Sequence, residues 1–190
     1  KSSQTIQLMA GASQTQAQIS NPDRAKAGLN SQTSELNSTE TNIGLEHQYR
    51  FEDGMYVSAT ANIGQLSNSF TDVYGGSAKQ KGTTFNVSLE TSKPYQIANW
   101  TLEPQAQIVF QQLHLNAFND AISNIESLTT HNTRWRAGVK LSRQNAVLKV
   151  SDFFTQIDLL QDHQSNKSIN ISHENINAKL DNQPWLGLTI

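Results

Sequence analysis

The chain has 190 residues and a net charge of −2, so it lacks the basic surface that a nucleic-acid partner would require. It contains no cysteine, which excludes disulfide frameworks and cysteine-ligated metals within these residues. Only 36% of the residues are hydrophobic, and no run of about 18 apolar residues predicts a transmembrane helix. Because the chain begins at Lys1 without a methionine, we expect it to be a piece of a longer protein.

The first expected strand covers residues 4–19. Ile6, Leu8 and Ala10 share one face of it, and glutamines continue that face toward its end. Residues 21–40 are mostly polar and include Pro22 and Gly28, which predicts a long loop.

Residues 41–51 alternate polar and apolar side chains almost without error, which indicates a strand whose two faces meet different media. The Asp53–Gly54 pair after it is a hairpin-turn signal, and a third alternating strand follows at 55–64. Residues 68–81, with Gly75–Gly76, predict a second long loop.

Three more alternating stretches follow at 84–92, 100–110 and 134–141. We expect a short link at 93–99, a long loop with a helical turn over 118–125 at 116–132, and a short turn at 142–145. A less regular strand at 147–160, a polar stretch at 161–177 and a last strand at 180–190 complete the chain. Pro104 lacks a ladder donor in the middle of its strand and predicts a bulge there.

The connections therefore alternate long and short, the pattern of outer-membrane β-barrels, and each apolar band has the roughly nine to eleven residues that cross a bilayer. Aromatic residues near several strand ends, Tyr56 among them, fit the belts at the rims of such barrels. A soluble β-sandwich also alternates, so alternation by itself leaves that fold open. We expect an all-β fold, an antiparallel meander that forms part of a transmembrane β-barrel.

The two faces of the expected barrel wall have different residues. The side chains expected to line the lumen are Glu46, Arg50, Glu90, Glu103, Gln105, Arg134, Arg136 and Lys140. The side chains expected to face lipid are Ile43, Leu45, Val57, Val87, Leu89, Leu102, Ile108, Phe110, Val139 and Leu141. The five histidines have no ligand spacing, so we expect no metal site and no cofactor.

Residues 100–121, WTLEPQAQIVFQQLHLNAFNDA, resemble a signature of the β-barrel translocator domain of classical autotransporters. The segments GLEHQY from Gly44, VSLETSKPY from Val87 and RAGVKLS from Arg136 resemble neighbouring strands of that family in the same order. Ser92 stands where the family usually has glycine. The resemblance covers most of residues 4–159.

The resemblance implies a twelve-stranded barrel in the bacterial outer membrane, a helix in its lumen, and an N-terminal passenger exported by type V secretion. About eight strands are visible, so residues 1–190 would be a fragment of this barrel domain that lacks the lumenal helix, the first strands and the last strand. The implied partners are outer-membrane lipid, the protein's own passenger segment and the outer-membrane barrel assembly machinery.

Some members of the family cleave their passenger with an asparagine on the helix and acidic lumenal groups. No such helix is visible, so we expect no enzyme and assign no catalytic residue. Glu90 and Glu103 are expected to pair with Arg134, Arg136 or Lys140 instead. A small porin-like outer-membrane channel and a soluble β-sandwich binding module remain the alternative functions.

Overall fold

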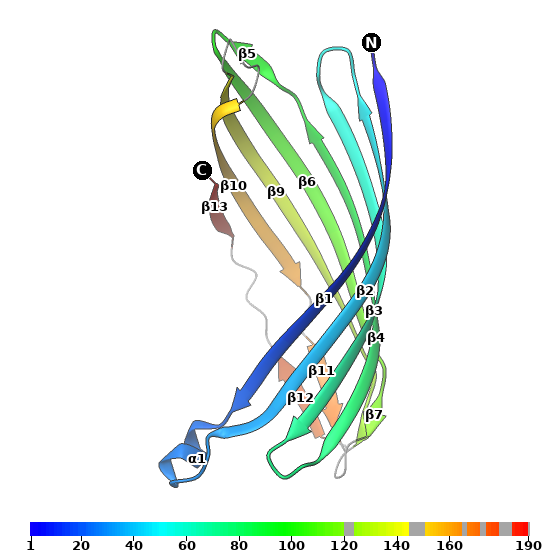
Figure 1. The fold of residues 1–190 in the computed structure, drawn as a ribbon, viewed down its shortest axis with the longest axis vertical. Coiled ribbons are helices and arrows are strands. Elements are labelled where there is room, and N and C mark those ends of the chain that lie inside the picture. The colour runs from blue at the N-terminus through cyan, green and yellow to red at the C-terminus, as the bar shows by residue number, and fades with distance from the viewer. Residues whose placement is uncertain (120–123, 145–150, 165–166, 172–173, 179–183, 190) are drawn as a thin grey trace.

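The structure is a computed structural model that describes residues 1–119, 124–144, 151–164, 167–171, 174–178 and 184–189, most of them in strands (Figure 1). The elements are β1 (Ser3–Ser20), α1 (Pro22–Lys26), β2 (Gln32–Arg50), β3 (Tyr56–Asp72), β4 (Ser77–Ser92), β5 (Tyr95–Ile97), β6 (Trp100–Leu115), β7 (Phe118–Asn119), β8 (Asn124–Ile125), β9 (Leu128–Gln144), β10 (Ser151–Gln164), β11 (Lys167–Ile171), β12 (Glu174–Ala178) and β13 (Trp185–Thr189). None of the helical residues described forms a segment long and apolar enough to cross a membrane.

The main sheet has the order β1-β2-β3-β4-β6-β9-β10-β13, and the short β5 pairs with β6 as well. Every neighbouring pair in it is antiparallel. Successive long strands are neighbours, so the sheet is the meander that the sequence predicts, and the expected all-β fold class is confirmed. A second sheet, β12-β11-β8-β7, joins residues that follow β6 to residues that follow β10.

The burial of side chains is the reverse of that in a soluble domain. Among the described residues, Leu160 is the only buried hydrophobic side chain, whereas Ile43 and Leu45 are 53% and 50% exposed. The buried side chains are otherwise polar and include Ser58 and Ser92, which are 7% and 2% exposed. The described residues therefore contain no hydrophobic core between two protein layers.

The strands are much longer than the sequence indicates. β2 begins at Gln32, β3 ends at Asp72 and β4 begins at Ser77, so the predicted long loops at 21–40 and 68–81 are wrong at 32–40, 68–72 and 77–81. Residues 34–40 of β2 pair with 66–72 of β3 without a break. Apart from Leu36, residues 34–40 are polar on both faces, and a strand with two polar faces has no period-two hydrophobic signal.

The later connections also differ from the expectation. Phe118–Asn119 and Asn124–Ile125 pair as strands, so the predicted helical turn over 118–125 is wrong at these residues, and residues 120–123 lie outside the described residues. The link at 93–99 contains β5, and the ladder of β6 with β9 runs through Pro104 without the predicted bulge. β9 extends through most of the turn expected at 142–145, and β10 and β11 occupy part of the polar stretch at 161–177. Residues 145–150 and 179–183, at the start of the last two predicted strands, lie outside the described residues.

The turn between β2 and β3 packs against the link between β4 and β5 at one end of the main sheet. Gly54 has a φ of +85°, a left-handed conformation that favours glycine, and a Cβ there would lie 2.9 Å from Cγ of Pro94. The helix α1 and the strands β7, β11 and β12 lie at the opposite end (Figure 1). The connection that contains α1 therefore lies at the end of the sheet opposite the turn between β2 and β3, and the short turn between β3 and β4 lies at that opposite end as well.

The extended strands predict a pattern of amide hydrogen exchange in the folded full-length protein. Amides of residues 34–40 should be protected to a degree similar to those of 41–50, because both segments are paired with β1 and β3. Residues 25–30, in the connection that contains the end of α1, are the control and should exchange fast. If the amides of 34–40 exchange as fast as those of 25–30, then residues 34–40 form a loop, as the sequence predicted, and not a strand.

Candidate functional site

One face of the main sheet collects the charged and amide side chains, and we call it the polar face. Register places Ser58, Glu90, Gln107 and Arg136 opposite one another on successive strands. Opposed residues of an antiparallel pair share a face, and residues two positions apart along a strand share it too. The other residues of the polar face are therefore found by counting in twos from these four. The polar face includes all eight residues that were expected to line a lumen: Glu46, Arg50, Glu90, Glu103, Gln105, Arg134, Arg136 and Lys140.

The other face, which we call the apolar face, contains all ten residues that were expected to contact lipid. Val87 opposes Phe110, and Leu89 opposes Ile108. The apolar face includes Ile43, Leu45, Val57, Val87, Leu89, Leu102, Ile108, Phe110, Val139 and Leu141. These side chains are half-buried or exposed, since no described protein layer covers them.

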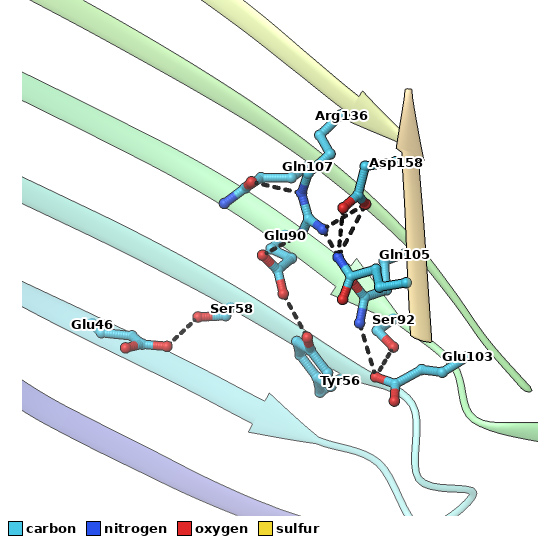
Figure 2. A network of polar contacts seen from close by, with 11 residues as sticks. Glu46, Tyr56, Ser58, Glu90, Ser92, Glu103, Gln105, Gln107, Arg136 and Asp158 are labelled. Atoms are coloured by element: carbon cyan, nitrogen blue, oxygen red, sulfur yellow. Dashed lines mark hydrogen bonds and ion pairs between the residues drawn. The ribbon is translucent and has the colours of Figure 1, made fainter. Parts of the chain in front are cut away.

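Arg136 on β9 is the centre of a hydrogen-bonded cluster on the polar face (Figure 2). Its Nε donates to Gln107 at 3.1 Å, and its Nη1 donates to Gln105 at 3.0 Å. It forms ion pairs with Oε2 of Glu90 at 2.9 Å and with Oδ1 of Asp158 at 3.1 Å. Only 15% of the Arg136 side chain is exposed, so these acceptors replace most of the water around the guanidinium.

The two carboxylates that flank Arg136 have further donors. The hydroxyl of Tyr56 donates to Oε1 of Glu90 at 2.5 Å, and Nε2 of Gln156 donates to Oδ2 of Asp158 at 2.8 Å. We call these residues the Arg136 cluster: Tyr56, Glu90, Gln105, Gln107, Arg136, Gln156 and Asp158. The cluster joins β3, β4, β6, β9 and β10 through side chains as well as through backbone ladders.

A second ion pair lies beside this cluster, between Arg134 and Asp162. Nε and Nη2 of Arg134 donate to the two carboxylate oxygens at 2.7 and 2.8 Å, a bidentate geometry. The guanidinium also lies 5.8 Å from the ring centroid of Trp185 on β13. This ion pair therefore links β9 to β10, and the contact with Trp185 adds β13.

The remaining predicted lumen residues have weaker partners. Glu103 accepts hydrogen bonds from Ser92 and Gln105, and no cation in the described part of the chain forms an ion pair with it. Nζ of Lys140 lies 5.4 Å from the ring centroid of Phe154, and Glu46 accepts from the hydroxyl of Ser58 at 2.7 Å. Of the pairs expected from the sequence, the structure contains Glu90 with Arg136.

Sequence reasoning missed the acidic partners on β10. Asp158 and Asp162 lie in or beside the strand predicted at 147–160, whose less regular alternation does not separate its two faces clearly. Tyr56 was assigned to an aromatic belt, whereas its hydroxyl bonds to Glu90 on the polar face. The signal that could have found Asp158 is its position between Ile157 and Leu159, because successive residues of a strand point to opposite faces.

On the polar face, Arg134 is paired at close range with Asp162, and Arg136 is paired with Glu90 and Asp158. Glu46, Glu90 and Asp158 each accept a hydrogen bond from a neutral side chain as well. Among the described residues, no group of three or more His, Cys, Asp or Glu side chains is placed to hold a metal ion.

Replacement of Arg136 by methionine should destabilise the folded full-length protein by about 2–4 kcal/mol, because two largely buried carboxylates lose their cation. Urea unfolding, followed by the heat-modifiable gel mobility of the barrel, measures this change. Arg50→Met is the matched control on the same face. Arg50 is exposed and has a 3.5 Å hydrogen bond to Gly54, so its loss should cost less than about 0.5 kcal/mol. Equal effects of the two variants would contradict the central place of Arg136.

Gly138 makes room for the Asp158 carboxylate. A Cβ at Gly138 would lie 2.0 Å from Oδ1 of Asp158, so Gly138→Ala should displace that carboxylate from Arg136 and cost about 1–3 kcal/mol. Gly187, on the opposite side of Asp158 in the same row, is the control. A Cβ there meets Leu160 at an ordinary 3.5 Å, so Gly187→Ala should be near neutral in the same unfolding assay. A neutral Gly138→Ala would refute the packing argument.

Comparison with known proteins identifies the family of this fold and polar face. A family model described as "Autotransporter beta-domain" matches residues 4–175, which is most of the chain. No curated protein and no solved structure matches the chain. The family consists of outer-membrane β-barrels of Gram-negative bacteria that act in type V secretion. The chain belongs to the autotransporter β-domain family and has the outer-membrane translocator role of that family.

Proposed function

We propose that residues 1–190 form most of a translocator barrel that anchors its own passenger and exports it to the cell surface. In this proposal the polar face lines a water-filled lumen, and the apolar face contacts the hydrocarbon of the outer membrane. Other parts of the full-length protein supply the lumenal helix and the first and last strands. The chain acts by providing a passage and not by catalysing a reaction.

The inverted burial of side chains is the observation that supports this proposal. Leu45 and Val87 are 50% and 38% exposed, whereas Asp158 on the opposite face is 8% exposed. In water, such an apolar surface would be a strong aggregation hazard, but in a bilayer it is the required surface. The absence of Asp, Glu, Lys and Arg from the apolar face between residues 43 and 63 fits the cost of about 2–4 kcal/mol for a cation facing lipid.

The charges on the polar face support passage of a polar polypeptide. Glu40 and Glu46 on β2 accept hydrogen bonds from the hydroxyls of Thr84 and Ser58, and no cation among the described residues forms an ion pair with either. Carboxylates of this kind can exchange a hydroxyl donor for an amide or ammonium group of a passing chain. Arg136 is saturated by its own cluster, so we expect it to stabilise the wall rather than to bind the passenger.

The unpaired edge strands of the sheet indicate that its insertion into a membrane requires a partner protein. In the described residues, β1 pairs with β2 on one side alone, and β13 pairs with β10 on one side alone. Unpaired backbone groups are very costly in hydrocarbon, so the edges must pair before or during insertion. We therefore propose the outer-membrane barrel assembly machinery as a partner that holds these edges.

Single cysteines test the assignment of the two faces directly, because the natural chain segment contains none. Asn62 and Ala61 are neighbours on β3 and lie on the polar and apolar faces respectively. In the full-length protein in vesicles, Asn62→Cys should react with a membrane-impermeant maleimide, and Ala61→Cys should not. Thr60→Cys and Ala59→Cys repeat the comparison two residues away.

The same variants in a detergent-free unfolded state are the control, since all four cysteines should then react. Reaction at Ala61 and protection at Asn62 would indicate a soluble sandwich with a buried apolar face. Reaction at both positions would show that the sheet is not in a membrane.

A further inference from the structure

A groove crosses the apolar face of β3, β4, β6, β9 and β10. It has a volume of about 580 Å³, and its floor is a cross-strand row of short side chains, Thr91, Ala106 and Ala137. Val57 and Leu159 stand at the two ends of this row. We call these five residues the outward groove. Four strand spacings of about 4.8 Å give it a length of about 19 Å, which suits an extended acyl chain.

The outward groove lies directly behind the Arg136 cluster. Ala106 lies between Gln105 and Gln107 in sequence, and Ala137 follows Arg136, so each floor residue is backed by cluster residues on the other face. The interstrand hydrogen bonds of the cluster hold the strands that form the floor. The groove is therefore a fixed feature of the sheet rather than a gap between mobile side chains.

An exposed pair of opposite charges lies on the side of the groove that faces the turn between β2 and β3, next to Val57 and Thr91. Nζ of Lys93, two residues beyond Thr91, lies 2.8 Å from Oδ2 of Asp53. The Lys93 and Asp53 side chains are 40% and 51% exposed. Met55 also lines the outward groove. Its backbone N–H donates to Oδ1 of Asp53 at 3.2 Å. The charged pair and the apolar groove thus form one continuous surface.

Both members of the pair are charged at neutral pH. A hydrogen bond from Lys93 lowers the pKa of Asp53 below its usual range, and the same bond raises the pKa of Lys93. Exposed ion pairs are weakly held, so a ligand with one positive and one negative group can insert between them. The ring of Tyr95 lies 5.7 Å from Nζ of Lys93 and marks the interface level where headgroups lie.

We propose that the outward groove and the Lys93–Asp53 pair bind one glycerophospholipid with a phosphoethanolamine headgroup. An acyl chain occupies the groove, the phosphate binds Lys93, and the primary ammonium donates to Asp53. A choline headgroup cannot donate such hydrogen bonds, and a phosphoglycerol headgroup has no cation for Asp53. The inference rests on the proposed function, since it requires that the apolar face contact lipid.

The fluorescence of Trp135 reports on lipid at this site, because Trp135 lines the outward groove and is 57% exposed. The full-length protein and its Trp135→Phe variant are placed in phosphatidylcholine vesicles with a minor fraction of lipid brominated on the acyl chain. The difference between the two proteins isolates the fluorescence of Trp135. The brominated lipid carries an ethanolamine, choline or glycerol headgroup in three parallel samples.

Brominated phosphatidylethanolamine should quench Trp135 about two- to fivefold more per mole than the other two lipids, the range expected for one exposed ionic contact. Asp53→Asn should reduce this preference to parity, whereas Glu52→Gln, which removes a carboxylate from the same turn, should leave it unchanged. Ala137→Leu, which fills the floor, should lower quenching by every lipid. Ala59→Leu, an outward-facing substitution outside the groove, should not.

Equal quenching by the three lipids in the unmodified protein would overturn the headgroup inference and leave the membrane barrel intact. A preference that survives Asp53→Asn, or that is also lost in Glu52→Gln, would overturn the assignment of the ammonium to Asp53. Absence of quenching by every brominated lipid would instead contradict the proposed function itself.

Discussion

The structure depends on complete backbone pairing between neighbouring long strands. From β1 to β10 the ladders run almost unbroken, so the inner strands satisfy their N–H and C=O groups within the sheet. Hydrocarbon offers no alternative partner for these groups, and an unpaired one is very costly there. This pairing leaves the side chains free to have opposite polarity on the two faces, because no hydrophobic core is needed to hold the strands together.

The polar face adds a second set of bonds across the same strands. Arg136 reaches acceptors on β4, β6 and β10, and Arg134 reaches β10 and packs beside β13. The two guanidinium groups are stabilised here because each is paired with carboxylates at hydrogen-bond distance. Glycine at 138 permits the close approach of Asp158, since any larger side chain would occupy the position of its carboxylate.

The sequence predicts the strands and their faces well where the two faces meet different media. Ile43 to Phe51 and Phe85 to Thr91 alternate clearly, and the structure puts each predicted residue on its expected face. Prediction fails where both faces are polar, as in residues 32–40, since pairing then leaves no trace in hydropathy. Glu90 is an expected partner of Arg136, but the pairing of Arg136 with Asp158 could not be derived, because the register that brings Asp158 to Arg136 is a property of the folded sheet.

The two faces of the sheet are coupled through the alternation of its strands. Ala106 and Ala137 lie next in sequence to Gln105, Gln107 and Arg136, so the bonds on the polar face fix the spacing of the short side chains on the apolar face. A loss of Arg136 would relax the strands below the outward groove as well as the polar wall. A barrel wall that is a single sheet has no second layer that could absorb such a change. A substitution on one face therefore alters the spacing of side chains on the other face.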